Sequence, residues 1–180
     1  MITTTCSKVF GEFPFAHRQH NHDGHCALIH GHNWNFKITF AADKLDLNEF
    51  VVDFGKLKWI RSWLDSNFDH TLVLNADDPL LEYLKNGLLS KSLAKIVEVP
   101  NGGAEGLARW ILEQLNAALS GTSAGVPQEW VDRHVRVIAV EVFEDSKNSA
   151  RVSLEPAEIA KLFHEIIARD VQTGGGEAQA

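Results

Sequence analysis

Six of the nine histidines lie in one sixteen-residue stretch, and this concentration calls for a chemical explanation. His30 and His32 are separated only by Gly31, and residues two apart on a strand point to the same face. His17 closes the sequence Phe-Pro-Phe-Ala-His, and a hairpin over residues 18–29 would bring it opposite that pair. Three neutral imidazoles without a fourth protein ligand are typical of a catalytic zinc site. The spacing therefore predicts a metal site at His17, His30 and His32.

Cys26 lies four positions before His30, on the loop that would cover such a metal. A thiol near a divalent cation or an imidazole is readily deprotonated and can act as a base or nucleophile. Two other interpretations stay open: a small buried apolar residue, or a direct ligand in a Cys/His3 structural site. Cys6 is expected to be buried. We expect the remaining histidines of the cluster to be solvated loop residues: His20, His22 and His25.

Two more groups carry acid/base or binding potential. Asp69 and His70 place a carboxylate next to an imidazole, and a carboxylate can orient the ring and select its tautomer. An Asp-His dipeptide is weak evidence by itself. Glu144 follows a predicted strand and, taken alone, is an ordinary exposed turn residue.

The strands that must position these residues follow from the hydrophobic pattern. A first strand ends at His17, and residues 33–40 alternate strictly between apolar and polar side chains, which predicts a half-buried strand. Residues 134–143 and 149–154 have strand character, with a turn at 144–148 between them, so they predict a hairpin.

The helices are predicted from apolar spacing and caps. Asp53 can cap a helix over 54–67, and a second amphipathic helix covers 104–119. Pro156 opens a last helix over 156–169. Between the first two helices we expect an irregular region with a strand at 94–99. Antiparallel strands with helices between them predict an α+β sheet covered on one face.

The chain has 180 residues and a mass of 20.0 kDa, which fits one domain over 1–170 followed by a disordered tail at 171–180. Its two cysteines are expected to be free thiols. The net charge of −7 argues against a broad nucleic-acid face and against attraction to anionic lipid. Apolar runs are too short to span a membrane and the N-terminus lacks a secretory pattern, so we expect a cytoplasmic protein.

Together these residues resemble the 6-pyruvoyltetrahydropterin synthase / 6-carboxytetrahydropterin synthase family. The matching segments run in order from about residue 10 to 152, and in combination they are highly specific. They are Phe13 to His17, Cys26 with His30-Gly31-His32, Val52 to Lys58, Asp69-His70 with Leu74-Asn75, Ala104-Glu105 with Leu107-Ala108, and Glu144 with Asn148 and Ala150.

The resemblance implies a role for each candidate residue. It implies zinc on the three histidines, a catalytic thiol at Cys26 and an acid/base pair at Asp69 and His70. It also implies that Glu144 and Glu105 bind the pterin substrate. The implied architecture is the T-fold, in which small sheets join around a barrel with helices outside. Two stacked trimers then form a homohexamer with sites between subunits.

The same resemblance bears on the product. Three residues separate Cys26 from His30, a spacing that resembles the bacterial 6-carboxytetrahydropterin synthases of the queuosine pathway. The implied reaction converts 7,8-dihydroneopterin triphosphate to 6-carboxy-5,6,7,8-tetrahydropterin, acetaldehyde and triphosphate. The alternatives are the pyruvoyl-forming enzyme, an aldolase-like cleavage of dihydroneopterin, and a non-catalytic pterin- or zinc-binding relative.

Gly102-Gly103 depart from the family's usual Pro-Thr. The candidate triphosphate-binding cations are Arg18, Lys37 and Lys56.

Overall fold

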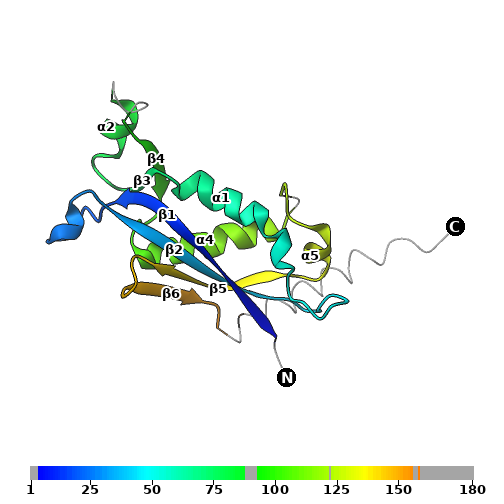
Figure 1. Cartoon of the computed structure of the whole chain (residues 1–180). Coiled ribbons are helices and arrows are strands. Elements are labelled where there is room, and N and C mark those ends of the chain that lie inside the picture. Colours follow the sequence, from blue (N-terminus) through cyan, green and yellow to red (C-terminus); the bar gives the residue numbers. More distant parts are fainter. Residues whose placement is uncertain (1–3, 88–92, 122, 156–157, 159–180) are drawn as a thin grey trace.

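A single six-stranded sheet forms the centre of the computed structural model, which describes residues 4–87, 93–121, 123–155 and 158 (Figure 1). The strand order is β4-β3-β1-β2-β5-β6. The strands are β1 (Thr5–His17), β2 (His30–Ala41), β3 (Thr71–Asn75), β4 (Lys95–Val99), β5 (Arg136–Phe143) and β6 (Ser149–Ser153). The pairs β1-β2 and β5-β6 are the two predicted antiparallel hairpins, and β2-β5 is also antiparallel, whereas β1-β3 and β3-β4 are parallel. The sheet is therefore mixed at one edge.

Two long helices, α1 (Lys58–Phe68) and α4 (Ala104–Leu119), lie together on one face of the sheet (Figure 1). Their apolar stripes, with Leu64 and Ile111 at the centre, join the same core cluster as Trp34 of β2. This arrangement confirms the predicted α+β class with helices on one face. The shorter helical segments are η1 (His25–Ala27), η2 (Phe54–Lys56), α2 (Leu81–Asn86) and α5 (Gln128–Asp132). Within the described ranges, no helix is long and apolar enough to cross a membrane.

Strand β2 shows the alternation that its sequence predicts. Trp34, Phe36, Ile38 and Phe40 are fully buried, while the residues between them are more exposed. His30 and His32 share the parity of Trp34, so both histidines lie on the helix-covered face of the sheet.

A β-bulge in β1 sets the direction of His17. Phe10 pairs with Phe36 but Phe13 pairs with Trp34, so β1 contains one extra residue between these pairs. Glu12, inside the bulge, has a φ of 66°. The extra residue shifts the alternation by one, and His17 therefore faces the buried side, as Phe13 does.

Several predicted boundaries shift slightly. The Asp53 cap is present, because its carboxylate accepts a hydrogen bond from the Gly55 amide at 2.8 Å, and it opens the 3-10 turn η2 just before α1. Strand β4 lies within the predicted 94–99 range. Strand β3 and helices α2 and α5 were not predicted. The predicted helix at 156–169 and the tail at 171–180 fall outside the described residues, apart from position 158.

Candidate metal centre and active site

Three histidines converge at one end of the β1-β2 hairpin. His17 is the direct cross-strand partner of His30, and His32 lies two residues further along the same face. The ring centroids are 4.6 Å apart for His17 and His30, 5.6 Å for His17 and His32, and 5.1 Å for His30 and His32. The predicted hairpin and the predicted grouping of these three rings are both present.

Backbone carbonyls select the nitrogen that two of these rings present. His17 Nδ1 donates to the Gly102 carbonyl at 2.8 Å, and His30 Nδ1 donates to the Leu28 carbonyl at 2.7 Å. Because a carbonyl only accepts hydrogen bonds, Nδ1 carries the proton in each neutral ring and Nε2 keeps its lone pair. A metal-binding histidine usually has this arrangement: one ring nitrogen binds the metal and the other donates its N–H to a protein group.

Glu144 completes the group from the turn after β5. Its Oε1 lies 3.3 Å from His17 Nε2 and 3.1 Å from His32 Nε2, yet neither nitrogen has a hydrogen-bond partner although both are buried. In a tetrahedral zinc site with bonds of about 2.0–2.1 Å, two ligand atoms lie about 3.3–3.4 Å from each other. The distances from Glu144 Oε1 to the two histidine nitrogens are close to this ligand–ligand distance. A carboxylate facing imidazole lone pairs is repelled by them unless a proton or a metal cation lies between, and a divalent metal would satisfy all of these groups together. The four residues therefore fit a divalent metal.

The electrostatics of His17 favour the metal-binding form. Burial is the largest influence and lowers the pKa of His17, and the neighbouring His30 and His32 rings lower it further. The Gly102 hydrogen bond and the Glu144 charge act in the opposite direction without reversing the shift. The imidazole of His17 is therefore neutral at neutral pH, as a metal ligand must be.

A pocket of about 440 Å³ opens beside this group, and Cys26 forms part of its wall together with His17 and Glu144. Cys26 lies in the 3-10 turn η1 and is exposed, so the buried apolar interpretation of this thiol is wrong. It also stands outside the group of four possible metal ligands. Cys6 is partly buried, and both cysteines are free thiols.

Glu105 lines the same pocket from the first turn of α4. Two glycines, Gly102 and Gly103, lie directly before α4. Gly102 uses its carbonyl for His17 and its amide for Asn75, which accepts that hydrogen bond at 2.7 Å. A Cβ on Gly103 would lie only 2.9 Å from the Gln19 side chain. Gly102 thus links His17 to Asn75 through backbone groups alone.

The Asp69-His70 pair forms but lies away from this pocket. His70 Nδ1 is 2.8 Å from Asp69 Oδ1, and the His70 ring is 81% exposed. The His70 amide bonds to the Pro14 carbonyl, three residues before His17 along β1, and His70 has a left-handed φ of 53°. Neither residue is among those lining the pocket.

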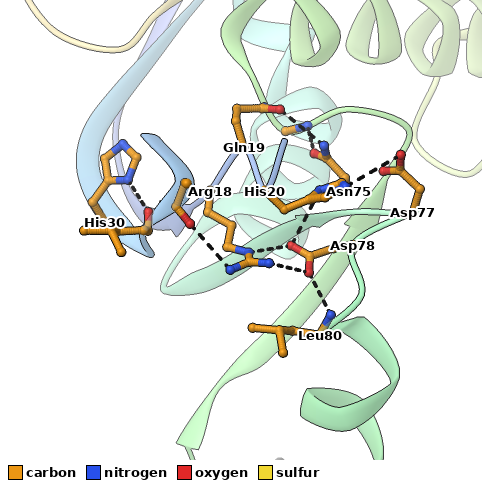
Figure 2. Close-up of polar contacts among 11 residues, drawn as sticks. Arg18, Gln19, His20, His30, Asn75, Asp77, Asp78 and Leu80 are labelled. Carbon is orange, nitrogen blue, oxygen red and sulfur yellow. Dashed lines mark hydrogen bonds and ion pairs between the residues drawn. The ribbon is translucent and has the colours of Figure 1, made fainter. Parts of the chain in front are cut away.

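The remaining loop histidines behave differently from one another. His22 and His25 are exposed, as expected, and His22 Nδ1 accepts a bond from the Gly24 amide. The expectation for His20 is wrong, because its side chain is only 8% exposed and lies between Asp77 and Asp78, 3.9 Å from each (Figure 2). The interior position follows from the acidic turn after β3, a strand that the sequence did not reveal.

The candidate cations are also placed by the structure. Arg18 forms an ion pair with Asp78, and Lys56 forms one with Glu129, each at 2.7 Å. Lys37 is on β2 but on the face of the sheet opposite to His30 and His32. None of these three lines the pocket, whereas Lys147, which was not predicted, does. Lys147 lies in the same 144–148 turn as Glu144, and this position in the sequence could have indicated that it lines the pocket.

Comparison with known proteins agrees with this geometry. The family model described as 6-pyruvoyl tetrahydropterin synthase matches residues 6–155. A 6-carboxy-5,6,7,8-tetrahydropterin synthase from Rickettsia typhi is 43% identical over 68 residues, which is 37% of this chain and 49% of that protein. The match thus spans about half the length of that relative. The synthase of the same name from Aquifex aeolicus is 28% identical over 133 residues, covering 72% of this chain and 76% of that one.

Solved structures share the fold. An uncharacterized protein from Wolinella succinogenes superimposes with a TM-score of 0.67 at 22% identity, over 86% of this chain and 100% of that chain. A 6-pyruvoyltetrahydropterin synthase from Plasmodium falciparum has a TM-score of 0.57 at 19% identity, over 82% of this chain and 96% of that chain. These similarities confirm the predicted T-fold. Since the family model covers most of the chain, the protein belongs to the 6-pyruvoyl tetrahydropterin synthase family.

Proposed function

We propose that the protein is a zinc-dependent 6-carboxy-5,6,7,8-tetrahydropterin synthase. In this reaction 7,8-dihydroneopterin triphosphate and one water molecule give 6-carboxytetrahydropterin, acetaldehyde and triphosphate. The observation that carries the proposal is the convergence of three histidines and Glu144 beside a pocket that is lined by His17, Glu144 and Cys26. The names of the relatives and the three-residue spacing between Cys26 and His30 favour this product over the pyruvoyl one.

Zinc is the proposed metal because imidazole and carboxylate ligands in a small group suit it well. His17, His30 and His32 would hold the ion. When bound, zinc supplies Lewis-acid polarisation of the side-chain hydroxyls of the substrate. The Glu144 carboxylate belongs to both the metal group and the pocket wall, so it is within reach of the ion and of a bound ring.

The chain's own side chains would then move protons and orient the substrate. Cys26, in its exposed turn, is the proposed base that removes a proton from the pterin side chain. Glu144 and Glu105 are the proposed acceptors for the N-H groups of the aminopyrimidine edge, through charge-assisted hydrogen bonds.

Asp69 and His70 are the proposed acid/base pair. Asp69 accepts the His70 Nδ1 proton and leaves Nε2 free to exchange protons with substrate. Because the pair lies outside the pocket of its own chain, we propose that it serves the pocket of a neighbouring subunit in a homohexamer of two trimers. The reaction would belong to queuosine (7-deazaguanine) biosynthesis in the cytoplasm.

Product analysis tests the proposal. The protein, loaded with zinc and incubated with 7,8-dihydroneopterin triphosphate, should release acetaldehyde and a product with the mass of 6-carboxytetrahydropterin. A product with the mass of 6-pyruvoyltetrahydropterin would assign the alternative enzyme instead. The absence of any product from a zinc-loaded protein would identify a binding relative.

Replacing the thiol tests the role of Cys26. Cys26→Ala should keep its zinc, because sulfur is not among the proposed ligands, and should lose turnover by at least about 100-fold. Cys6→Ala is the matched control and should retain both properties. Turnover at the wild-type level in Cys26→Ala would remove Cys26 from the mechanism.

A further inference from the structure

A buried ion pair between Arg18 and Asp78 contacts the turn that carries Cys26. Arg18 Nε donates to Asp78 Oδ2 at 2.7 Å, and Arg18 Nη2 donates to Asp78 Oδ1 at 2.9 Å (Figure 2). The side chain of Asp78 is fully buried and that of Arg18 is 16% exposed. A bidentate pair of this kind fixes the plane of the guanidinium as well as its position.

The acidic partner is anchored to the sheet. Asp78 belongs to the turn after β3, where its amide donates to the Asn75 carbonyl at 3.0 Å. The Leu80 amide donates to Asp78 Oδ1 at 2.8 Å. Burial acts to raise the pKa of Asp78, but the hydrogen bonds from Arg18 and Leu80 outweigh it and hold that pKa below its ordinary value. Asp78 is therefore a fixed, ionised support.

The basic partner connects this support to the catalytic turn. The third nitrogen of the fork, Arg18 Nη1, donates to the Ala27 carbonyl at 3.4 Å. The next residue, Gln19, donates its amide to the Cys26 carbonyl at 2.7 Å. The consecutive carbonyls of Cys26 and Ala27 are thus held by the consecutive residues Gln19 and Arg18.

The same geometry argues against a substrate-binding role for Arg18. Two of its nitrogens are occupied by a carboxylate that is itself fully buried, and a third is directed at a backbone carbonyl. Arg18 does not line the pocket, although Gln19 and Cys26 do. Drawing the guanidinium into the pocket would leave the Asp78 charge buried without a partner, which is strongly unfavourable.

We propose that Arg18 and Asp78 are positioning residues that hold the Cys26 turn against the metal-binding histidines. The pair acts through the bond from Arg18 to the Ala27 carbonyl, and by fixing Arg18 it also places the neighbouring Gln19 amide that holds the Cys26 carbonyl. It touches neither substrate nor metal. The role given to Cys26 rests on the proposed function, whereas the anchoring of the turn does not. A displacement of about 1 Å in a reacting group can cost up to about 100-fold in rate, so a positioning pair has measurable weight.

Arg18→Lys tests the proposal, because lysine keeps the positive charge but lacks the planar fork. We expect kcat to fall about tenfold, KM to stay within about twofold and the zinc content to remain at the wild-type level. Hydrogen exchange of the backbone amides in segment 18–29 should accelerate, while exchange in α1 stays unchanged. Arg61→Lys is the matched control, since Arg61 also contacts a carboxylate, Asp65, and a carbonyl, that of Gly11.

The outcomes separate the alternatives. If Arg18 binds triphosphate, Arg18→Gln raises KM at least tenfold and Arg18→Lys largely restores it, which would overturn the proposal. Wild-type kcat together with wild-type exchange in Arg18→Lys would also overturn it. Should that variant not fold, the double variant Arg18→Met with Asp78→Leu removes both charges and is expected to fold, bind zinc and show the same loss of kcat.

The exchange measurement also separates this proposal from the proposed function, because it requires no substrate. Faster exchange in 18–29 that appears in Arg18→Lys and not in Arg61→Lys supports the anchoring role even if wild-type protein turns over no pterin. Unchanged exchange contradicts the anchoring role even if wild-type protein is fully active.

Discussion

Two histidines of this site are oriented by backbone carbonyls that bond the ring nitrogen facing away from the proposed ion. The carbonyls of Gly102 and Leu28 hold the Nδ1 protons of His17 and His30, and this leaves both Nε2 atoms directed toward the proposed ion. The sequence was sufficient to predict which histidines meet, because strand parity and hairpin pairing are local rules. It could not predict that Glu144 joins them or that His20 is buried, because both depend on contacts between distant segments.

The ionisation of Asp78 gives a pH-dependent prediction at this scale. Because the folded state lowers its pKa, Asp78 stabilises the fold at pH values above the ordinary carboxyl pKa of about 3.9, and this contribution is lost as the pH falls through the lowered folded pKa. We expect Asp78→Asn to lower the free energy of unfolding by about 3 kcal/mol at pH 7. Urea unfolding at several pH values should show the difference shrinking below about pH 4. A difference that is the same at pH 7 and pH 3 would contradict this assignment.

At the scale of elements, the sequence predicted well wherever periodicity is strong. The strictly alternating 33–40 segment became the centre of β2, and the 104–119 segment became α4 with the same bounds. Strand β3 was missed because all five of its residues, Thr71–Asn75, are buried, so no alternation marks it. The bulge in β1 was also invisible, although it decides which face His17 occupies.

The missed strand carries a residue with a prediction of its own. Asn75, at the end of β3, accepts the Gly102 amide at 2.7 Å and donates to Gln19 at 3.2 Å, so it fixes Gly102, whose carbonyl orients His17. We expect Asn75→Ala to weaken zinc binding about 10- to 100-fold, which is the usual effect of removing a hydrogen-bonding group that helps to orient a metal ligand. Competition with a chromophoric chelator measures this change.

A matched control for this variant is Asn67→Ala, because Asn67 donates only within α1, to the Trp63 carbonyl. It should leave zinc affinity within about twofold of wild type. Equal losses of affinity in both variants would show that Asn75 acts through general stability and not through the Gly102 peptide.

At the scale of the whole molecule, one chain does not bring all of the proposed catalytic groups together. Cys26 lies in the pocket wall, while Asp69 and His70 are exposed outside it. A symmetric assembly can repair this separation, because every pocket then meets the same surface of a neighbouring copy. The oligomeric state could not be read from the sequence pattern and entered only through the family resemblance.

Complementation between inactive variants tests this arrangement. Cys26→Ala and His70→Ala should each be inactive alone. If each site takes Cys26 from one chain and His70 from another, co-expression at equal levels should restore about one quarter of wild-type activity, because half of the chains supply each intact group. Activity that stays at the level of the separate variants would place the thiol and the imidazole in the same chain.

The most direct test of the central claim is anomalous diffraction at the zinc absorption edge, from crystals of the protein purified with zinc. The geometry predicts one strong peak per chain, at about 2.0–2.1 Å from the Nε2 atoms of His17, His30 and His32, with no sulfur ligand. A peak bound to Cys26 Sγ, or no peak between these three rings, would contradict the metal centre on which the proposed chemistry depends.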